Sequence, residues 1–424
     1  MLQIIPITVI TWVILQARSS FSRIPGPNKA HDIDVSLHRK YNPLVRFGPN
    51  MVSIADPREV SHVYAFSHPW VKSDFYHVLL MKPRGKPIPG IYAAQDEAVH
   101  RSLKRPVAGA YAMSTLVSFE PHVDTAMRVF CEQLESRVGD RSEICDFEKW
   151  PQMFAFDVIG ELTFSRRLGF LESGEDVNNV MANIWETFKK TSLVTQMPWI
   201  DKFWLNNPIQ RYRPGGGASP GAAFAMARAQ ERRQLQKTTD ENDWDFNTRD
   251  FLSRFMEIEA KDKTVPPCAL AAWASSNITA GSDTICIFLR SNELASWKQT
   301  GELPYLDAMI EEGSRIHPPF GLPYERVLPK EGATICGNPE RWLRCDSEKR
   351  KLMENTLLTF GAGHRSCMGK HIAYLEMYKV IPILLQRFDF ELVGPDEGGT
   401  WDLKNRWLVI QEGFLVRLRR RKME

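Results

Sequence analysis

The residues from Phe360 to Gly369 form the motif with the clearest chemical meaning in the chain, F-x-x-G-x-R-x-C-x-G. A motif this specific arises by chance on the order of once in ten thousand chains. A thiolate that binds iron as an axial ligand pushes electron density toward the metal and favours O–O cleavage. A helical pattern begins directly after Cys367, so the helix dipole and the free backbone N–H groups favour the thiolate form. The motif therefore predicts an iron centre bound through Cys367.

The other positions of the motif suit a large, flat cofactor. Gly363 permits a tight turn, and Gly369 leaves room for a macrocycle to lie against the helix. Phe360 can cover the sulfur and exclude water, while Arg365 can reach an acidic propionate. The other six cysteines show no paired spacing, and we expect them to be small buried hydrophobic residues.

These residues identify the chain as similar to cytochromes P450, and more specifically to fungal microsomal monooxygenases of the pisatin-demethylase-like kind. The resemblance extends from Pro25 to about residue 416, through KYNPLVRFGPN, DVIGELTF, PYLDAMIEEGSRIHPP, NPERW and the cysteine motif. It implies haem b and molecular oxygen as partners in the reaction, with electrons from NADPH–cytochrome P450 reductase. The implied substrate is a small lipophilic molecule.

The segment Ala280–Thr284, AGSDT, matches the family's oxygen-activation motif. Gly281 has no side chain, so the helix can open a groove for dioxygen beside the iron. Thr284 can hold a hydrogen-bonded water and Asp283 can hand on protons, which makes both catalytic candidates. The alternative is a threonine bonded back to its own helix beside a solvated aspartate.

Glu312 and Arg315 form an E-x-x-R pair, one helical turn apart on one face. Such a pair also arises by chance in a chain of this size, so alone it is weak. With Arg341 in NPERW, it resembles the family's Glu-Arg-Arg cluster, whose role is folding and haem incorporation. We therefore expect all three residues to be structural.

The resemblance also suggests which cations bind the haem propionates. A solvated basic helix face is the alternative for each of them. The candidates are His100, Lys104, Arg105, Arg326 and Arg365. Some aromatic residues fall where family members line the substrate cavity, although core packing explains most of them equally well: Trp70, Phe75, Trp185 and Phe188.

Mostly helical patterns must position these residues. Val123, Met127, Phe130 and Leu134 recur at helical spacing, and residues 267–290, 303–316 and 368–388 are further helix candidates. Residues 44–56 predict two short strands around a Gly48-Pro49-Asn50 turn. We predict a mainly α protein with small β-sheets, the P450 fold, with haem between the long 267–290 helix and the cysteine motif.

Composition and the N-terminal residues indicate which partners and which location in the cell to expect. The 424 residues carry a net charge of +3, which gives no electrostatic case for nucleic acid as a partner. The apolar run of residues 4–15 is followed by Arg18 and Arg23, as in a short signal-anchor. We expect an anchor at 1–20 and a haem domain at 21–424, at the endoplasmic reticulum membrane and facing the cytoplasm. Residues 417–422, RLRRRK, predict a solvated tail.

Two stretches of the family pattern are missing, one after Arg290 and one after Gly337. The leading function is a monooxygenase of secondary metabolism or detoxification. A haem-dependent isomerase or dehydratase of the same fold is a first alternative, which the Asp283–Thr284 pair disfavours. A catalytically impaired or non-enzymatic haem-binding remnant is the second, because the missing stretches put folding in doubt.

Overall fold

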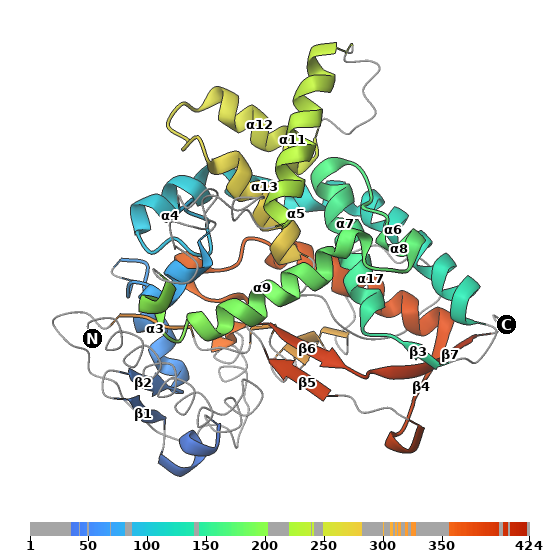
Figure 1. Cartoon of the computed structure of the whole chain (residues 1–424), viewed down its shortest axis with the longest axis horizontal. Coiled ribbons are helices and arrows are strands. Elements are labelled where there is room, and N and C mark those ends of the chain that lie inside the picture. Colours follow the sequence, from blue (N-terminus) through green and yellow to red (C-terminus); the bar gives the residue numbers. More distant parts are fainter. Residues whose placement is uncertain are drawn as a thin grey trace, which may run out of the picture.

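Helices form the body of the molecule and the strands lie along one side of it, as a computed structural model shows (Figure 1). It describes residues 35–41, 43–48, 51–67, 69–80, 87–139, 144–201, 220–238, 240, 249–281, 300, 306–307, 310–311, 313–314, 319–320, 324–327, 356–397, 402–405 and 408–421. Within these residues the strands form one three-stranded and two two-stranded sheets, all antiparallel. The prediction of a mainly α protein with small β-sheets is confirmed.

The labelled elements have the following bounds. The helices are α3 (Val60–Val63), α4 (Glu97–Lys104), α5 (Met113–Leu116), α6 (Glu120–Leu134), α7 (Lys149–Phe164), α8 (Phe170–Ser173), α9 (Val180–Val194), α11 (Pro220–Thr238), α12 (Phe251–Lys261), α13 (Ala269–Gly281) and α17 (Lys370–Arg387). The strands are β1 (Leu44–Gly48), β2 (Met51–Ile54), β3 (Ile144–Asp146), β4 (Phe388–Leu392), β5 (Asp402–Asn405), β6 (Val409–Glu412) and β7 (Leu415–Arg420).

Helices α6, α7 and α17 contribute many of the buried side chains of the hydrophobic core. The predicted stripe on α6, which is Val123, Met127, Phe130 and Leu134, is fully buried. Helix α7 is apolar on nearly all sides and is buried on nearly all sides, as expected for a helix enclosed by others. Pro382 lies inside α17 without ending it. The core therefore holds the helix that follows the cysteine motif.

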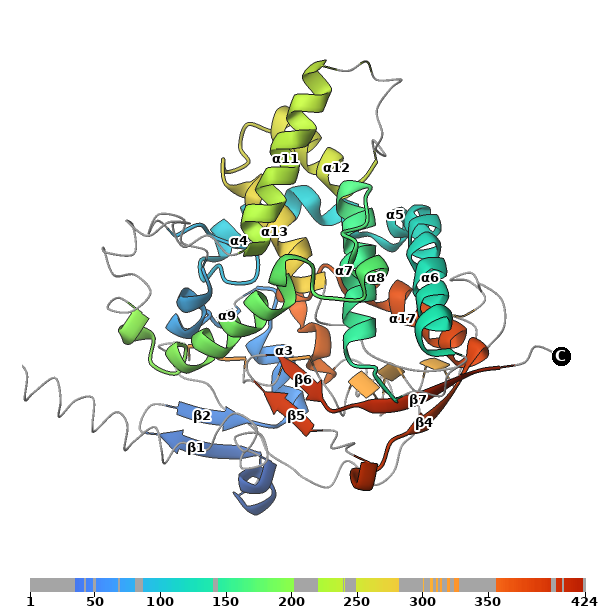
Figure 2. The ribbon, with the colours of Figure 1, turned by 45° about the vertical axis from the view of Figure 1, so that its right-hand side comes forward.

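The long helix predicted at 267–290 is described as α13 up to Gly281, and residues 282–299 lie outside the described residues. Helix α13 lies between α4 and α7 (Figure 2). A side-chain carbon on Gly281 would lie 2.9 Å from Ile159 Cγ1 of α7. The absence of a side chain at Gly281 thus allows α7 and α13 to pack closely, a reason for glycine separate from the predicted oxygen groove.

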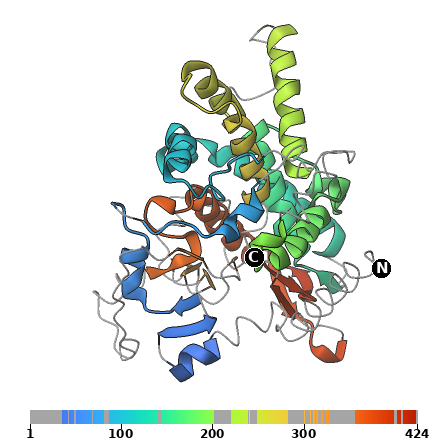
Figure 3. The ribbon, with the colours of Figure 1, turned by 60° about the vertical axis from the view of Figure 1, so that its left-hand side comes forward.

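The two strands predicted near the N-terminus are present, whereas the tail predicted near the C-terminus is a strand. The two strands expected within residues 44–56 are β1 and β2, with Leu44 opposite Ile54 (Figure 3). The solvated tail expected at 417–422 is wrong, because Leu415–Arg420 is β7, the central strand of the β3–β7–β4 sheet. Val416 and Leu418 point into the core and are fully buried. Arg417 and Arg419, which alternate with them, both pair with Glu391.

Several expectations cannot be compared with the structure. The predicted anchor at 1–20 and most of the predicted 303–316 helix lie outside the described residues. Among the helices that are described, none has the length and apolar character needed to cross a membrane.

Candidate active site

The cysteine loop, which we define as residues 358–369, is a compact turn ahead of α17. The Cys367 amide donates to the Phe360 carbonyl at 2.8 Å and the Ser366 amide donates to the Gly363 carbonyl at 3.1 Å. Gly361 and Gly363 have φ angles of +67° and +58°. A side-chain carbon on Gly363 would lie 2.2 Å from the Tyr64 carbonyl oxygen, so glycine is required both for the turn and for the close approach.

Cys367 is the chemical centre of this loop. It is exposed, yet protein surrounds its sulfur closely enough that burial is the main influence on the pKa of its thiol, which it raises. The backbone N–H groups of Gly369 and Lys370 and the charge of Lys104 lower the same pKa. The N–H groups at the start of α17 are oriented to stabilise its thiolate.

Gly369 leaves free space beside this sulfur. Among the described residues, a side-chain carbon there would meet only Cys367 Sγ within 4 Å, at 3.8 Å. Phe360 packs on the other side of the loop, with its ring centroid 5.2 Å from that of Tyr374 on α17. The side of the loop next to Gly369 can therefore accept a flat group.

Helix α4 brings a second set of side chains to the cysteine loop. Asp96 caps its first turn by accepting from the amides of Ala98 and Val99 at 2.7 and 3.1 Å. Lys104, at its last turn, donates from Nζ to the carbonyls of His364 and Ser366 at 2.7 and 2.8 Å. Figure 1 shows the orange segment ahead of α17 passing next to α4.

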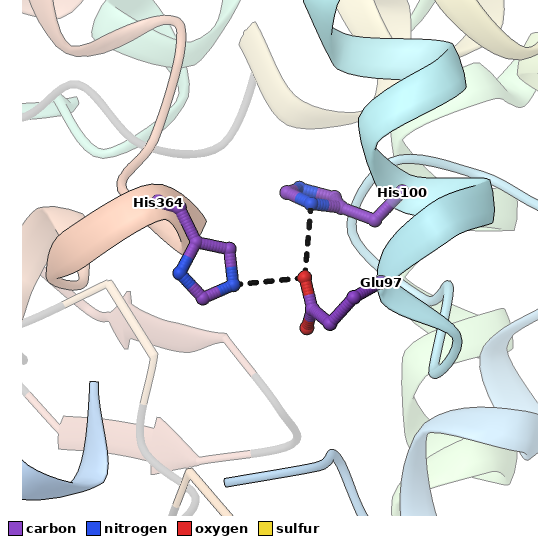
Figure 4. A group of neighbouring side chains, drawn as sticks. All are labelled: Glu97, His100 and His364. Atoms are coloured by element: carbon purple, nitrogen blue, oxygen red, sulfur yellow. Dashed lines mark ion pairs between the residues drawn. The ribbon is translucent and has the colours of Figure 1, made fainter. Parts of the chain in front are cut away.

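Glu97 of α4 gathers three basic side chains around its carboxylate. Arg365 Nε donates to Glu97 Oε1 at 2.8 Å and Arg365 Nη1 donates to the Ala94 carbonyl at 2.8 Å. The other oxygen, Oε2, lies 2.8 Å from His364 Nε2 and 3.5 Å from His100 Nδ1 (Figure 4). Although the first distance is short, neither ring nitrogen of His364 has a partner in hydrogen-bonding geometry within the described chain. Buried donors in this condition are available to an added acceptor.

Glu97, His100 and His364 meet the geometric requirement for a metal site, since their ligand atoms all lie within 4.8 Å of one another. Electrostatics oppose this use. Burial, followed by the positive charges of Arg365 and Lys104, lowers the pKa of His100 to about 3. Cations that keep a histidine neutral also repel a divalent metal ion. The site is therefore better suited to an anion.

Two further cations, Arg326 and Lys72, face the same place from another part of the chain. They pair in an isolated antiparallel bridge, and Arg326 Nη1 donates to the Tyr76 hydroxyl at 3.0 Å. Lys72 is 5% exposed, and its Nζ donates to the Tyr92 carbonyl. Burial, followed by the charges of Arg365 and Arg326, lowers the pKa of Lys72 to about 6. These residues, which we call the cationic cluster, are Lys72, His100, Lys104, Arg326 and Arg365.

The structure thus brings together four of the five cations predicted from sequence. The fifth, Arg105, is exposed on the surface and takes no part in the cluster. Lys72 was missed, because a single lysine in WVKSDFY carries no pattern that distinguishes it from a surface lysine. Its burial depends on contacts with distant segments, which one sequence does not reveal.

Other predicted residues lie outside the described residues, namely Asp283, Thr284, Glu312, Arg315 and Arg341. Their roles stay predictions. Of the aromatic candidates, Phe75 and Phe188 belong to one small apolar cluster together with Tyr76 and Phe320. Tyr92 stacks on Phe320 at a centroid distance of 5.6 Å. This aromatic group adjoins Lys72, whose Nζ lies over the rings of both Tyr76 and Tyr92.

The arrangement as a whole combines a soft, electron-rich sulfur ligand, free space beside it, and a group of basic side chains, of which Lys104, Arg326 and Arg365 are half-buried. A flat ligand with a central metal ion and two acidic groups would satisfy all three features. The thiolate would bind the metal ion, and the cations would bind the acids.

Comparison with known proteins places the chain in a family. A sequence model of the family described as "Cytochrome P450" matches residues 10–291 and 338–416. A "Cytochrome P450 monooxygenase" of Aspergillus terreus is 63% identical, and the match covers 91% of this chain and 93% of the relative. "Cytochrome P450 monooxygenase cicH" of Emericella nidulans is 39% identical, over 97% of this chain and 96% of the relative.

The same comparisons support the two missing stretches. The family match breaks between residues 291 and 338, within one residue of the two predicted joints. The alignment with the Aspergillus terreus protein spans 459 positions, whereas 91% of this chain is only about 386 residues. About 70 positions of that alignment are therefore gaps in this chain. The family model matches most of the chain, and both relatives align over more than 90% of it. The chain therefore belongs to the cytochrome P450 family and is a P450 monooxygenase.

Proposed function

We propose that this monooxygenase carries haem b, with the Cys367 thiolate as its axial ligand, and oxidises a small lipophilic molecule. The observation that supports this most strongly is the position of Cys367. Its thiol lies at the start of α17, beside the space left by Gly369 and near the cationic cluster. When bound, haem supplies the iron chemistry that activates molecular oxygen.

The chain's own residues hold this group in separate ways. The backbone N–H groups of Gly369 and Lys370 stabilise the thiolate of Cys367. Arg365 and Arg326 offer planar, charged donors to the propionates. His364 adds ring nitrogens that have no partner in hydrogen-bonding geometry among the described residues.

We assign proton delivery to Asp283 and Thr284, which follow the last residue of α13 in the sequence and lie outside the described residues. Thr284 Oγ1 would hold a water, and the Asp283 carboxyl would pass it a proton. Support comes from the part of α13 that is described. Trp273 and Asn277 fix this helix against its neighbours, because Trp273 Nε1 donates to the Leu103 carbonyl at 2.8 Å and Asn277 Nδ2 donates to Thr163 Oγ1 at 3.2 Å.

The lipophilic character of the substrate is supported by the aromatic group next to Lys72. Phe75 and Tyr76 are each 1% exposed and pack with Phe188 and Phe320. Such walls bind apolar rings through surface burial and edge or face contacts. We further propose NADPH–cytochrome P450 reductase as the electron donor and an anchor in residues 1–20 that holds the enzyme at the endoplasmic reticulum membrane, with the domain at 21–424 facing the cytoplasm. Secondary metabolism or detoxification is the proposed setting of the reaction.

A second candidate, an impaired haem-binding protein, is favoured by one observation besides the gaps. Glu376 on α17 is fully buried, and neither of its carboxylate oxygens has a hydrogen-bond partner within the described chain. Burial raises the pKa of this carboxyl well above its ordinary value. An uncompensated buried acid is expected where a partner segment has been lost.

A difference spectrum of the reduced protein with carbon monoxide separates the two candidates. The red-shifted Soret band typical of thiolate ligation is expected for the purified chain and is expected to disappear in Cys367→Ser, because a neutral hydroxyl is a poor donor to iron. Retention of this band in Cys367→Ser would exclude Cys367 as the ligand. A spectrum without haem absorption in the wild-type chain would favour the impaired protein.

A further inference from the structure

Helix α4 contacts both α13 and the cysteine loop, through the consecutive residues Leu103 and Lys104. The Leu103 carbonyl accepts from Trp273 Nε1 of α13 at 2.8 Å. The next residue, Lys104, donates from Nζ to the carbonyls of His364 and Ser366 at 2.7 and 2.8 Å. In Figure 2, α4 lies directly beside α13. The C-terminal end of α4 therefore connects α13 to the cysteine loop, the two elements between which we propose that the haem binds.

Lys104 differs from the other cations of the cluster in what it binds. Arg365 donates to the Glu97 carboxylate, so its charge is largely compensated nearby. The two hydrogen bonds of Lys104 Nζ go to the neutral backbone carbonyls of His364 and Ser366, the residues on either side of Arg365, and Ser366 directly precedes Cys367. Carbonyl acceptors hold an ammonium group in place without cancelling its charge.

Two effects follow from this geometry. First, the two bonds restrain the loop from the side of α4, at the carbonyls directly before the sulfur ligand. Second, the ammonium group of Lys104 lies close to the thiolate, whose charge favours the protonated amine even though burial lowers its pKa, and charges act more strongly there than in water. A cation there opposes the added negative charge of the thiolate and favours the state of the iron that has gained an electron.

We infer that Lys104 is a positioning residue of the cysteine loop, which it restrains through the carbonyls of His364 and Ser366, and that its charge raises the reduction potential of the haem iron. This inference rests on the proposed function for its second part. It differs from a propionate role for Lys104, which would act on haem affinity instead.

The test compares Lys104→Met and Lys104→Arg with Arg101→Met in the full-length chain. Arg101 is exposed on the same helix, so its substitution removes the same charge without touching the loop. Hydrogen exchange of the haem-free proteins reports on loop restraint. We expect amides of residues 363–369 to exchange at least about tenfold faster in Lys104→Met, because loss of even one of its two charge-assisted hydrogen bonds to the loop corresponds to about this factor, and to be unchanged in Arg101→Met.

The haem-loaded proteins test the charge. Lys104→Met should have a more negative reduction potential than the wild type, Lys104→Arg should restore it, and Arg101→Met should leave it unchanged. Should Lys104→Met not fold, Lys104→Gln serves as a second neutral variant. Unchanged exchange and potential in the neutral variant would overturn the inference, and so would faster haem loss as its only effect. A wild-type chain that binds no haem would refute the proposed function, whereas the exchange measurement would still decide the positioning role.

Discussion

Replacement of Lys72 by methionine is expected to stabilise the haem-free protein and to weaken its binding of haem. Lys72 is 5% exposed, and its Nζ lies 4.2 Å from the ring centroid of Tyr76 and 4.4 Å from that of Tyr92. Burial, followed by the charges of Arg365 and Arg326, lowers its pKa from 10.5 to about 6. At pH 7 the folded protein therefore holds Lys72 mostly neutral, whereas the unfolded chain holds it protonated.

The magnitude follows from this difference in bound protons. Between pH 10.5 and pH 6 the unfolded chain binds one proton more than the folded protein, so the unfavourable contribution of Lys72 grows as the pH falls and is complete below about pH 6. At about 1.4 kcal/mol per pH unit, the upper limit at pH 7 is about 4–5 kcal/mol. Methionine loses the hydrogen bond to the Tyr92 carbonyl, which is worth about 1 kcal/mol. Relaxation of the protein and solvent around the amine also makes the true penalty of the buried lysine smaller than this upper limit. We expect a net gain of about 1–3 kcal/mol.

Urea unfolding of the haem-free proteins at pH 7 and pH 10 measures this gain, which should shrink at the higher pH. Haem titration, followed by the Soret band, should show weaker binding in Lys72→Met, because the propionates lose a buried cation that their own charge would protonate. Lys72→Arg is the matched control and should keep haem affinity without the gain in stability. A less stable Lys72→Met protein at pH 7, or unchanged haem affinity, would refute the reasoning.

Three further predictions concern other parts of the chain. Thr284→Ala should retain haem but form less product per NADPH consumed, because proton delivery is impaired; unchanged coupling with a substrate found by screening would remove Thr284 from the proton path. Burial, followed by the charge of Asp146, raises the pKa of Glu148 to about 7 from 4.5, so its contribution to stability is present below pH 4.5 and is lost as the pH rises through 7. Glu148→Gln should therefore raise the melting temperature at pH 8, by an amount that corresponds to about 1–2 kcal/mol, and leave it unchanged at pH 4.5. Segments of family length inserted after Arg290 and Gly337 should raise the yield of haem-loaded protein several-fold, since buried side chains are worth about 1.5–3 kcal/mol each; a fully haem-loaded protein of the present sequence would contradict this.

Local patterns of the sequence carried the correct predictions. The fully buried stripe of α6 follows from helical spacing alone. Gly363 was predicted as a turn residue, and it does adopt a positive φ angle. In both cases neighbouring residues contain the information, because a helix face and a tight turn are determined within a few positions.

Long-range contacts account for what the sequence did not reveal. Lys72 becomes part of the cationic cluster only because Arg326, some 250 residues later, pairs with its backbone. The tail at 417–422 was misread since its arginines suggested solvent, although the alternation of Val416 and Leu418 with charged residues is the two-residue period of a strand. Lys104 lies near other predicted cations, but its bonds to the cysteine loop depend on how α4 packs and could not be predicted from the sequence.

The place of β7 has a consequence for how the protein is made. This strand lies in the middle of its sheet, with β3 and β4 on either side, and Ile144 pairs with Arg417. A ribosome adds about 5–20 residues per second and makes β7 after both of its neighbours in the sheet. After β3 emerges, roughly 270 further residues must follow, so its edge stays unpaired for on the order of tens of seconds. For most of that interval β3 has neither of the other strands of its sheet, because β4 (Phe388–Leu392) is made only shortly before β7, so the sheet can close only once β7 has emerged.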